Sequence, residues 1–195
     1  YYPRITRVCH SRLRTRVFAS QEVNIMMLCL LPIISIFLIA RELIVSILYS
    51  GEFRAIIPYI SFAIVGTVMR AYSWFLAIVI VARGDGKIYI VTETLSVLTG
   101  FALNVACYHL WGLAGLGVAF CLWYAAYCLI VGVVYFRSYG YSLSRQSSLL
   151  SLFTLAFCAA IVFLLNEGWL WAAIAATAII SLFAGIRLRR LVSHR

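Results

Sequence analysis

The sequence predicts an all-α fold, a polytopic membrane bundle of six transmembrane helices. The first observation is the composition, because 65% of the 195 residues are hydrophobic and 11% are charged. A soluble domain of this size would lack the polar side chains needed to cover its surface. The second observation is that the apolar residues fall in long runs, and about 20 such residues are enough for a helix to cross a bilayer. The third is that the arginines gather between these runs and at the two ends of the chain, as expected for the loops of a membrane protein.

The basic segment 1–22 is predicted to be a helical, cytosolic connecting segment. Contact with anionic membrane lipids is compatible with its charge. One acid, Glu22, stands against five arginines: Arg4, Arg7, Arg12, Arg14 and Arg16.

The first span is predicted at 23–40, with Pro32 at its centre. A proline removes one backbone hydrogen bond, so we expect either a static bend or a mobile kink there. An interfacial pair, a short apolar continuation and a turn are expected to follow, at Arg41-Glu42, 43–49 and 50–54.

The second and third spans, 56–82 and 88–110, are joined by a charged hairpin at 83–87. Each of these two spans carries one charge, Arg70 in the first and Glu93 in the second. An arginine near the middle of a membrane helix costs roughly 2.5 to 3.5 kcal/mol on insertion scales. Such a cost predicts that Arg70 faces protein, water or a ligand. Whether Arg70 pairs with Glu93 is left open by the spacing.

Helical periodicity gives both charges a polar or small-residue face. The face of Arg70 holds Ala63, Gly66, Thr67, Ser73, Trp74 and Ala77. The stripe of Glu93 continues through Ser96, Gly100, Asn104 and Cys107.

The fourth span, 112–136, contains no charge and follows a very short connection at Trp111-Gly112. Its small residues form a stripe that favours close helix packing. Tyr124 and Tyr127 lie off that stripe, where each is expected either in the packed core or at a cavity large enough for a sugar.

The polar loop 137–145 leads to a fifth span at 148–165 and a sixth at 168–186. Both spans lack charge, so we expect them to be peripheral helices without a site. A basic tail follows them.

The distribution of arginine and lysine predicts the orientation. If the N-terminus is cytosolic and the spans alternate, thirteen arginines and lysines lie on the cytosolic side and two, Arg41 and Arg54, on the far side. Cytosolic loops of membrane proteins carry such an excess. Both ends of the chain are therefore predicted to be cytosolic.

The sequence lacks the motifs of several classes of function. The residues 83–87 lack the spacing of a phosphate-binding P-loop. The sequence also contains no nucleophile elbow and no pair of carboxylates placed together in a loop. The six cysteines show no ligand spacing and are expected to act as small hydrophobic residues. We therefore expect no enzyme activity, no metal and no cofactor. The formal net charge of +10 is explained by orientation in the membrane rather than by nucleic-acid binding.

Several short stretches, in this order and spacing, resemble the bacterial O-antigen and oligosaccharide flippases. That family belongs to the multidrug, oligosaccharidyl-lipid and polysaccharide exporter superfamily, and the resemblance covers roughly residues 1–140. The stretches are Tyr2-Pro3-Arg4-Ile5-Thr6, Ile47-Leu48-Tyr49-Ser50-Gly51-Glu52-Phe53, Arg70 with Ser73-Trp74, Ala82-Arg83-Gly84-Asp85-Gly86-Lys87, Glu93, Asn104 and Trp111-Gly112-Leu113-Ala114-Gly115-Leu116-Gly117.

The resemblance implies a full protein of twelve to fourteen helices in two lobes around a central cavity. Such a protein moves an undecaprenyl-pyrophosphate-linked oligosaccharide across the inner membrane by alternating access. Residues 23–140 would be four spans of the C-terminal lobe, 141–195 would add two spans and the basic tail, and an N-terminal lobe would be missing. The expected cavity residues are Arg70, Ser73, Trp74, Glu93, Asn104 and Tyr124.

Two other functions remain open. A multidrug or cation antiporter of the same superfamily would prefer carboxylates in its cavity, whereas the central charge here is Arg70. A membrane scaffold that transports nothing would fit the neutral spans but would leave Arg70 without a purpose.

Overall fold

The computed structural model describes residues 2–48 and 56–193. Within these ranges the chain forms helices and no strand, which confirms the predicted all-helical class. The turn expected at 50–54 lies outside the described residues. The elements are α1 (Tyr2–Val8), α2 (Arg12–Leu48), α3 (Ile57–Ala82), α4 (Gly86–Gly132), the π-helical turn η2 (Val133–Ser138), α5 (Arg145–Asn166) and α6 (Leu170–Ser193).

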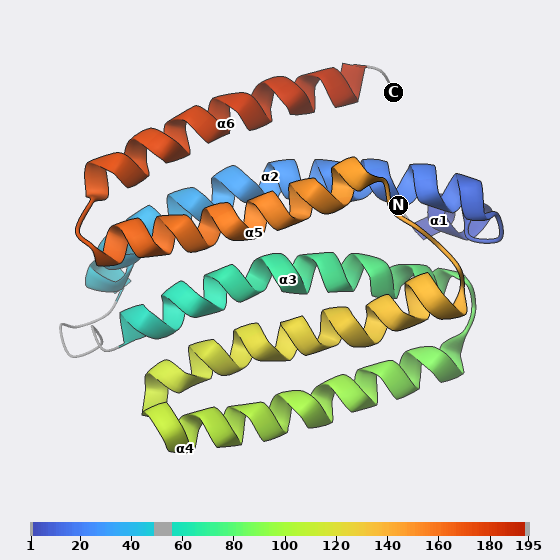
Figure 1. Cartoon of the computed structure of the whole chain (residues 1–195), viewed down its shortest axis with the longest axis horizontal. Coiled ribbons are helices and arrows are strands. Elements are labelled where there is room, and N and C mark those ends of the chain that lie inside the picture. The colour runs from blue at the N-terminus through green and yellow to red at the C-terminus, as the bar shows by residue number, and fades with distance from the viewer. Residues whose placement is uncertain (1, 49–55, 194–195) are drawn as a thin grey trace.

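The long helix α4 consists of two antiparallel arms, and the chain reverses direction between them (Figure 1). The reversal occurs at Gly112, where φ is 59° and ψ is −139°. Glycine adopts such a backbone without the steric penalty that other residues incur. The first arm is 86–111 and the second is 113–132, which matches the two spans expected at 88–110 and 112–136.

Five of the described helices, α2 to α6, are long and apolar enough to cross a membrane. The segment made by α4 and η2 is 53 residues long. Because it turns back at Gly112, it offers two crossings, so the described chain has six crossing segments in all.

Helix α2 joins stretches that differ in charge and hydropathy. It begins at Arg12 and continues through Pro32 to Leu48. The basic residues from 12 to 22, the span at 23–40 and the apolar continuation therefore form one helix. The physical reason is that an α-helix satisfies its own backbone hydrogen bonds, so a change from basic to apolar side chains requires no break. The division of the chain into parts at residues 22 and 140 stays a prediction.

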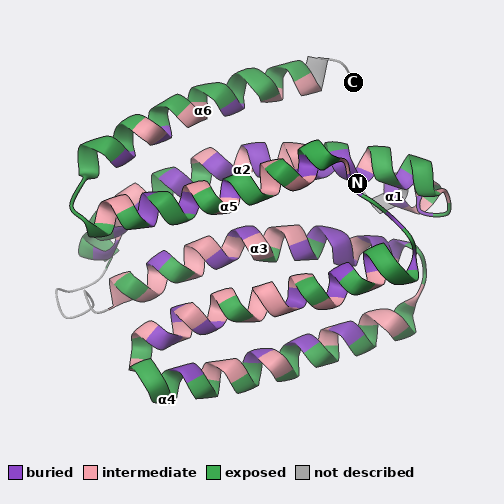
Figure 2. Ribbon diagram, in the orientation of Figure 1, coloured by how far each residue is buried: buried purple, intermediate pink, exposed green. Residues whose placement is uncertain are grey.

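The helices lie side by side, roughly parallel to one another (Figure 1). α2 packs against α3, α5 and α6, and α3 packs against both α5 and α4. The core lies among α2, α3, α5, the second arm of α4 and η2, and its fully buried members include Met27, Leu76, Ile80, Val131 and Tyr135. Figure 2 shows much of α6 and of the first arm of α4 exposed. Helix α5 buries the face that carries Cys158 and Ile161 in the core, while much of the rest of the helix is exposed.

Both described ends of the chain lie at the same end of the bundle, together with the α3–α4 connection and the loop before α5 (Figure 1). We call this the terminus end. The opposite end holds the reversal between the two arms of α4 and the connection between α5 and α6. Six crossings place the basic connections at 83–87 and 137–145 at the terminus end, as the alternation of spans requires.

A cluster of charged and phenolic side chains holds the terminus end together. Arg83 forms an ion pair with Asp85, with 3.2 Å between Nε and Oδ2, and donates a hydrogen bond of 3.1 Å to the Tyr141 hydroxyl. Its guanidinium also lies 4.2 Å from the centroid of the Tyr139 ring. Tyr139 donates to Asp85 at 2.5 Å, and Tyr141 donates to the carbonyl of Cys9. Burial, then the hydrogen bond to Asp85, raises the pKa of Tyr139 above its ordinary value.

At the opposite end, Arg41 is buried between three helices. Its side chain is 4% exposed, and it donates hydrogen bonds to the hydroxyl of Ser61 on α3 and to Oδ1 of Asn166 at 3.1 Å, the last residue of α5. The sequence placed Arg41 at an interface beside Glu42. The structure instead turns the guanidinium inward, where it connects α2 to α3 and α5.

Candidate functional site

Helix α3 and the two arms of α4 enclose an open hollow of about 500 Å³. We call it the α3–α4 hollow. Its lining combines one cation, one carboxylate and a set of aromatic rings. The lining residues are Thr67, Arg70, Ala71 and Trp74 from α3, Tyr89, Glu93, Ser96 and Val97 from the first arm, and Trp123, Tyr124 and Tyr127 from the second arm.

Arg70 reaches the hollow because of its place on α3. Thr67, Ala71 and Trp74 lie three, one and four residues from it, so they share one face of a helix with 3.6 residues per turn. The Arg70 side chain is exposed, and its guanidinium carbon lies 5.5 Å from the centroid of the Tyr124 ring. A cation over an aromatic face is attracted by the ring quadrupole. Tyr124 therefore orients the guanidinium without neutralising its charge.

Glu93 lies in the same hollow and accepts a hydrogen bond from the hydroxyl of Tyr127. Tyr127 is buried, at 5% exposure. Arg70 does not form an ion pair with Glu93 in the described part of the chain. Both charges thus face the hollow, each held by a tyrosine of the second arm.

The aromatic rings of the second arm form a row along the hollow. The rings of Trp123 and Tyr124 stack with their centroids 5.0 Å apart and an interplanar angle of 26°. The Trp123 indole donates a 3.0 Å hydrogen bond to Ser96 on the first arm. A Cβ atom at Gly100 would collide with the same indole ring, so the glycine makes room for Trp123 between the arms.

The structure brings together four of the six expected cavity residues, namely Arg70, Trp74, Glu93 and Tyr124. Ser73 is fully buried and donates to the backbone carbonyl of Arg70 at 2.9 Å. Asn104 donates to the carbonyl of Gly100 at 2.7 Å. Neither of these two residues lines the hollow.

Three aromatic residues that line the hollow were not among the expected cavity residues: Tyr89, Trp123 and Tyr127. Tyr127 belongs both to the packed core and to the wall of the hollow, since its side chain is buried and its hydroxyl reaches Glu93. Trp123 carried no signal in the sequence, because an aromatic residue in an apolar span normally belongs to a packed core.

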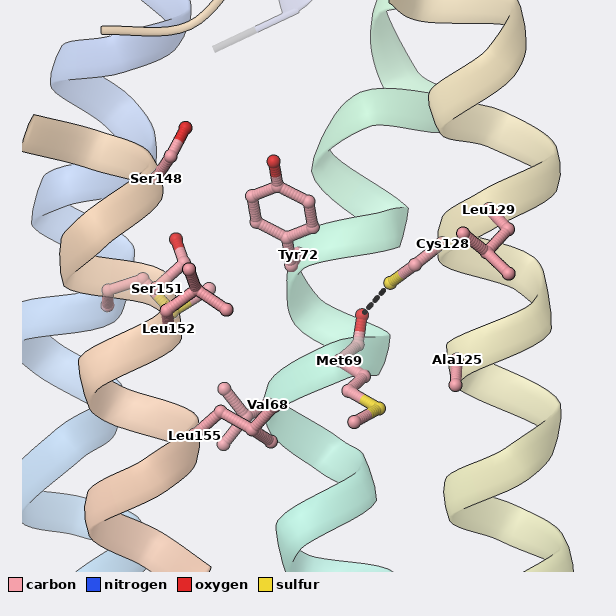
Figure 3. Close-up of a pocket in the computed structure, with 11 residues that line it drawn as sticks. Val68, Met69, Tyr72, Ala125, Cys128, Leu129, Ser148, Ser151, Leu152 and Leu155 are labelled. Carbon is pink, nitrogen blue, oxygen red and sulfur yellow. Dashed lines mark hydrogen bonds between the residues drawn. The ribbon is translucent and has the colours of Figure 1, made fainter. Parts of the chain in front are cut away.

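A second hollow, of about 450 Å³, lies on the other side of α3, among α2, α5 and the second arm of α4 (Figure 3). Its lining includes no charged residue. Polar atoms come from Tyr72, Ser148 and Ser151, and the Cys128 thiol donates to the carbonyl of Met69 at 3.3 Å. Of these two hollows, the α3–α4 hollow is therefore the one equipped for a charged or sugar-bearing ligand.

Comparison with protein-family models, with curated proteins and with solved structures gave no match to this chain. The site is therefore interpreted from its own geometry.

Proposed function

We propose that the chain is the C-terminal lobe of a transporter that moves an undecaprenyl-pyrophosphate-linked oligosaccharide across the bacterial inner membrane. The observation that carries the proposal is the exposed Arg70 guanidinium at the α3–α4 hollow, beside Tyr124 and without an ion-pair partner among the described residues. A guanidinium can contact two phosphate oxygens at once, which suits a pyrophosphate group.

The aromatic row supports the sugar part of the proposed substrate. Trp74 is 69% exposed and faces the same hollow as Trp123 and Tyr124. The apolar faces of sugar rings stack on indole and phenol rings, while Glu93 and Ser96 offer acceptors for sugar hydroxyls. The hollow thus combines a contact for an anionic head group with contacts for an uncharged oligosaccharide.

In this proposal the terminus end faces the cytosol and an N-terminal lobe supplies the other wall of the cavity. The basic residues gathered at the terminus end support that orientation, since cytosolic loops carry the excess of arginine and lysine. The exposed large apolar side chains Trp74 and Val97, which line the hollow, support a partner surface there.

Ligand binding by the purified chain in lipid nanodiscs tests the proposal. Trp74 and Trp123 are natural fluorescent probes of the hollow. We expect a lipid-linked oligosaccharide pyrophosphate to quench their emission, and Arg70→Ala to weaken binding by at least about tenfold, the loss expected for a hydrogen bond to a charged group. Arg137→Ala, which removes an exposed arginine outside the hollow, is the matched control. Equal binding by wild type and Arg70→Ala would contradict the proposal.

A cation antiporter is the second candidate, favoured by one observation. Glu93 lies in the hollow with Trp74, Trp123 and Tyr124, and aromatic rings beside a carboxylate suit an organic cation. The same nanodiscs distinguish the two functions. An antiporter would bind tetraphenylphosphonium in a way that depends on Glu93 and improves in Arg70→Ala, whereas a flippase would lose its anionic ligand in that variant.

A further inference from the structure

A separate cleft of about 310 Å³ lies among α2, α5 and α6 toward the terminus end. The sequence predicted no site on the last two helices. Six apolar side chains form most of the cleft wall: Leu28, Leu149, Leu150, Phe153, Phe183 and Leu191. The remaining three lining residues are Asn24, Gln146 and Arg187, so the cleft carries one positive charge and no acid.

Arg187 lies within α6, which continues to Ser193, and not beyond the end of the last helix. Side chains on a helix lean toward its N-terminus, which for α6 means toward the middle of the bundle. The Arg187 guanidinium carbon accordingly lies 5.6 Å from the centroid of the Phe183 ring, one turn earlier. Among the described residues Arg187 has no carboxylate partner. The Arg187 side chain is exposed, so its charge is available to an anion at the edge of the membrane.

Asn24 provides a second, independent observation at the same cleft. Its Oδ1 atom is buried and has no hydrogen-bond partner in the described part of the chain. An unsatisfied buried acceptor is unfavourable by roughly 1 to 3 kcal/mol. Rotation of the Asn24 amide toward a ligand that brings a hydroxyl or ammonium donor into the cleft would remove that penalty.

We propose that this cleft binds an anionic phospholipid of the leaflet at the terminus end. The phosphate contacts Arg187, a donor of the head group reaches Asn24, and one acyl chain lies between α5 and α6 along Phe153 and Phe183. Basic pockets between transmembrane helices on the cytoplasmic side bind lipid head groups in this way. A free anion would satisfy Arg187 but would leave the apolar walls uncovered, so the occupant is a lipid. This inference does not depend on what the α3–α4 hollow transports.

The bound lipid would also attach α6 to the rest of the bundle. α6 packs mainly against α2, and large side chains such as Ile179, Leu182 and Ile186 are exposed along it. A lipid wedged between α5 and α6 adds apolar contacts to both helices, so we expect the lipid to raise the unfolding temperature of the chain.

Native mass spectrometry of the purified chain, titrated with phosphatidylglycerol or with phosphatidylcholine, tests the proposal. We expect one phosphatidylglycerol to remain bound preferentially. Arg187→Gln should weaken that binding by at least about tenfold. Arg189→Gln, which removes an exposed arginine two residues away that does not line the cleft, should leave the preference unchanged. Leu149→Trp keeps the charge but fills the mouth of the cleft, and should also remove the bound lipid.

Several outcomes would overturn the proposal. Equal losses in Arg187→Gln and Arg189→Gln would reveal a general attraction of the basic tail for anionic lipid. Equal retention of phosphatidylcholine would mean that the cleft does not select lipids by the negative charge of the head group. Displacement by soluble glycerol phosphate would mean that the apolar walls contribute nothing, and displacement by a lipid-linked oligosaccharide would assign the cleft to the transported substrate. Circular dichroism of each variant checks that the helices still form. A folded Leu149→Trp variant that still binds the lipid would contradict the placement of the lipid in this cleft.

Discussion

Arg70 on α3 and Tyr124 on the second arm of α4 face each other across the α3–α4 hollow, with 5.5 Å between the guanidinium carbon and the ring centroid. A cation in the middle of a membrane helix is thereby held by an aromatic ring rather than by an acid. The arrangement keeps its positive charge available to a ligand. It also fixes where in the hollow that ligand's anionic group would lie.

The first prediction concerns substitutions of Arg70. Arg70→Lys should weaken transport without abolishing it, because the charge remains while the planar fork is lost. Arg70→Ala should lose transport at normal membrane abundance, since it removes a charge that is costly to insert. Arg70→Glu should be the most defective, because it repels an anionic head group. The flipping rate, measured alongside protein abundance, checks this series. Normal transport by Arg70→Ala, or a failure explained by degradation alone, would refute the substrate contact.

The second prediction concerns the partner lobe. In the proposed function the chain is one lobe and supplies one wall of a cavity, so the 195 residues expressed alone should insert into the membrane but not transport. Complementation of a flippase-null strain, read as surface polysaccharide, is the measurement. Co-expression with the N-terminal lobe of an oligosaccharide flippase is the positive control. Restored polysaccharide without that lobe would show that a second copy of the chain can replace it.

The third prediction concerns orientation. Cysteine at Gly86 should be shielded from an impermeant thiol reagent in intact cells, and cysteine at Glu167 should be labelled, in a background without the six native cysteines. Both positions are exposed, and a Cβ atom at Gly86 would meet nothing within 4 Å. Membranes opened before labelling provide the control, in which both positions should react. The reverse pattern in intact cells would invert the topology.

The fourth prediction concerns the contact between α3 and the second arm of α4. A Cβ atom at Gly117 would come within 2.7 Å of the carbonyl oxygen of Tyr59. Gly117→Ala should therefore separate the helices and lower the free energy of unfolding by about 1 to 3 kcal/mol, as overpacking does. Gly185→Ala is the matched control, because nothing lies within 4 Å of a Cβ atom there. Thermal unfolding in detergent should show a lower midpoint for the first variant and an equal or higher midpoint for the second.

The fifth prediction concerns the dependence of stability on pH. Folding raises the pKa of Tyr139 through burial and its hydrogen bond to Asp85. A group with a raised pKa stabilises the fold fully below its unfolded value, about 10 for tyrosine, and loses that contribution as the pH rises through the folded value. The unfolding temperature should therefore fall as the pH rises above about 10. Tyr139→Phe should be less stable at pH 9 but should show a smaller fall, and an identical fall in both proteins would contradict the assignment.

The sequence alone determined the class of the protein and the positions of its apolar spans. A helix in a membrane closes its own backbone hydrogen bonds and needs only enough apolar length, so these properties are local. The reversal at Gly112 was also predictable from the sequence, because two consecutive spans joined by a very short connection must run in opposite directions. What the composition did not show is that the basic residues and the first span share one helix, α2, which continues through the change from basic to apolar residues.

Only the tertiary structure decided which side chains meet. Ser73 and Trp74 are both spaced to share a face with Arg70, yet they lie about 100° apart around a helix of 3.6 residues per turn, and packing buried Ser73 while it left Trp74 in the hollow. Trp123 reached the hollow because Gly100 on the other arm leaves room for its ring. Arg187 belongs to the predicted basic tail, and the packing of α6 made it line a cleft with Asn24 of α2 and Leu149 of α5. Such contacts join residues far apart in the chain, and their energies depend on shapes that no single span contains.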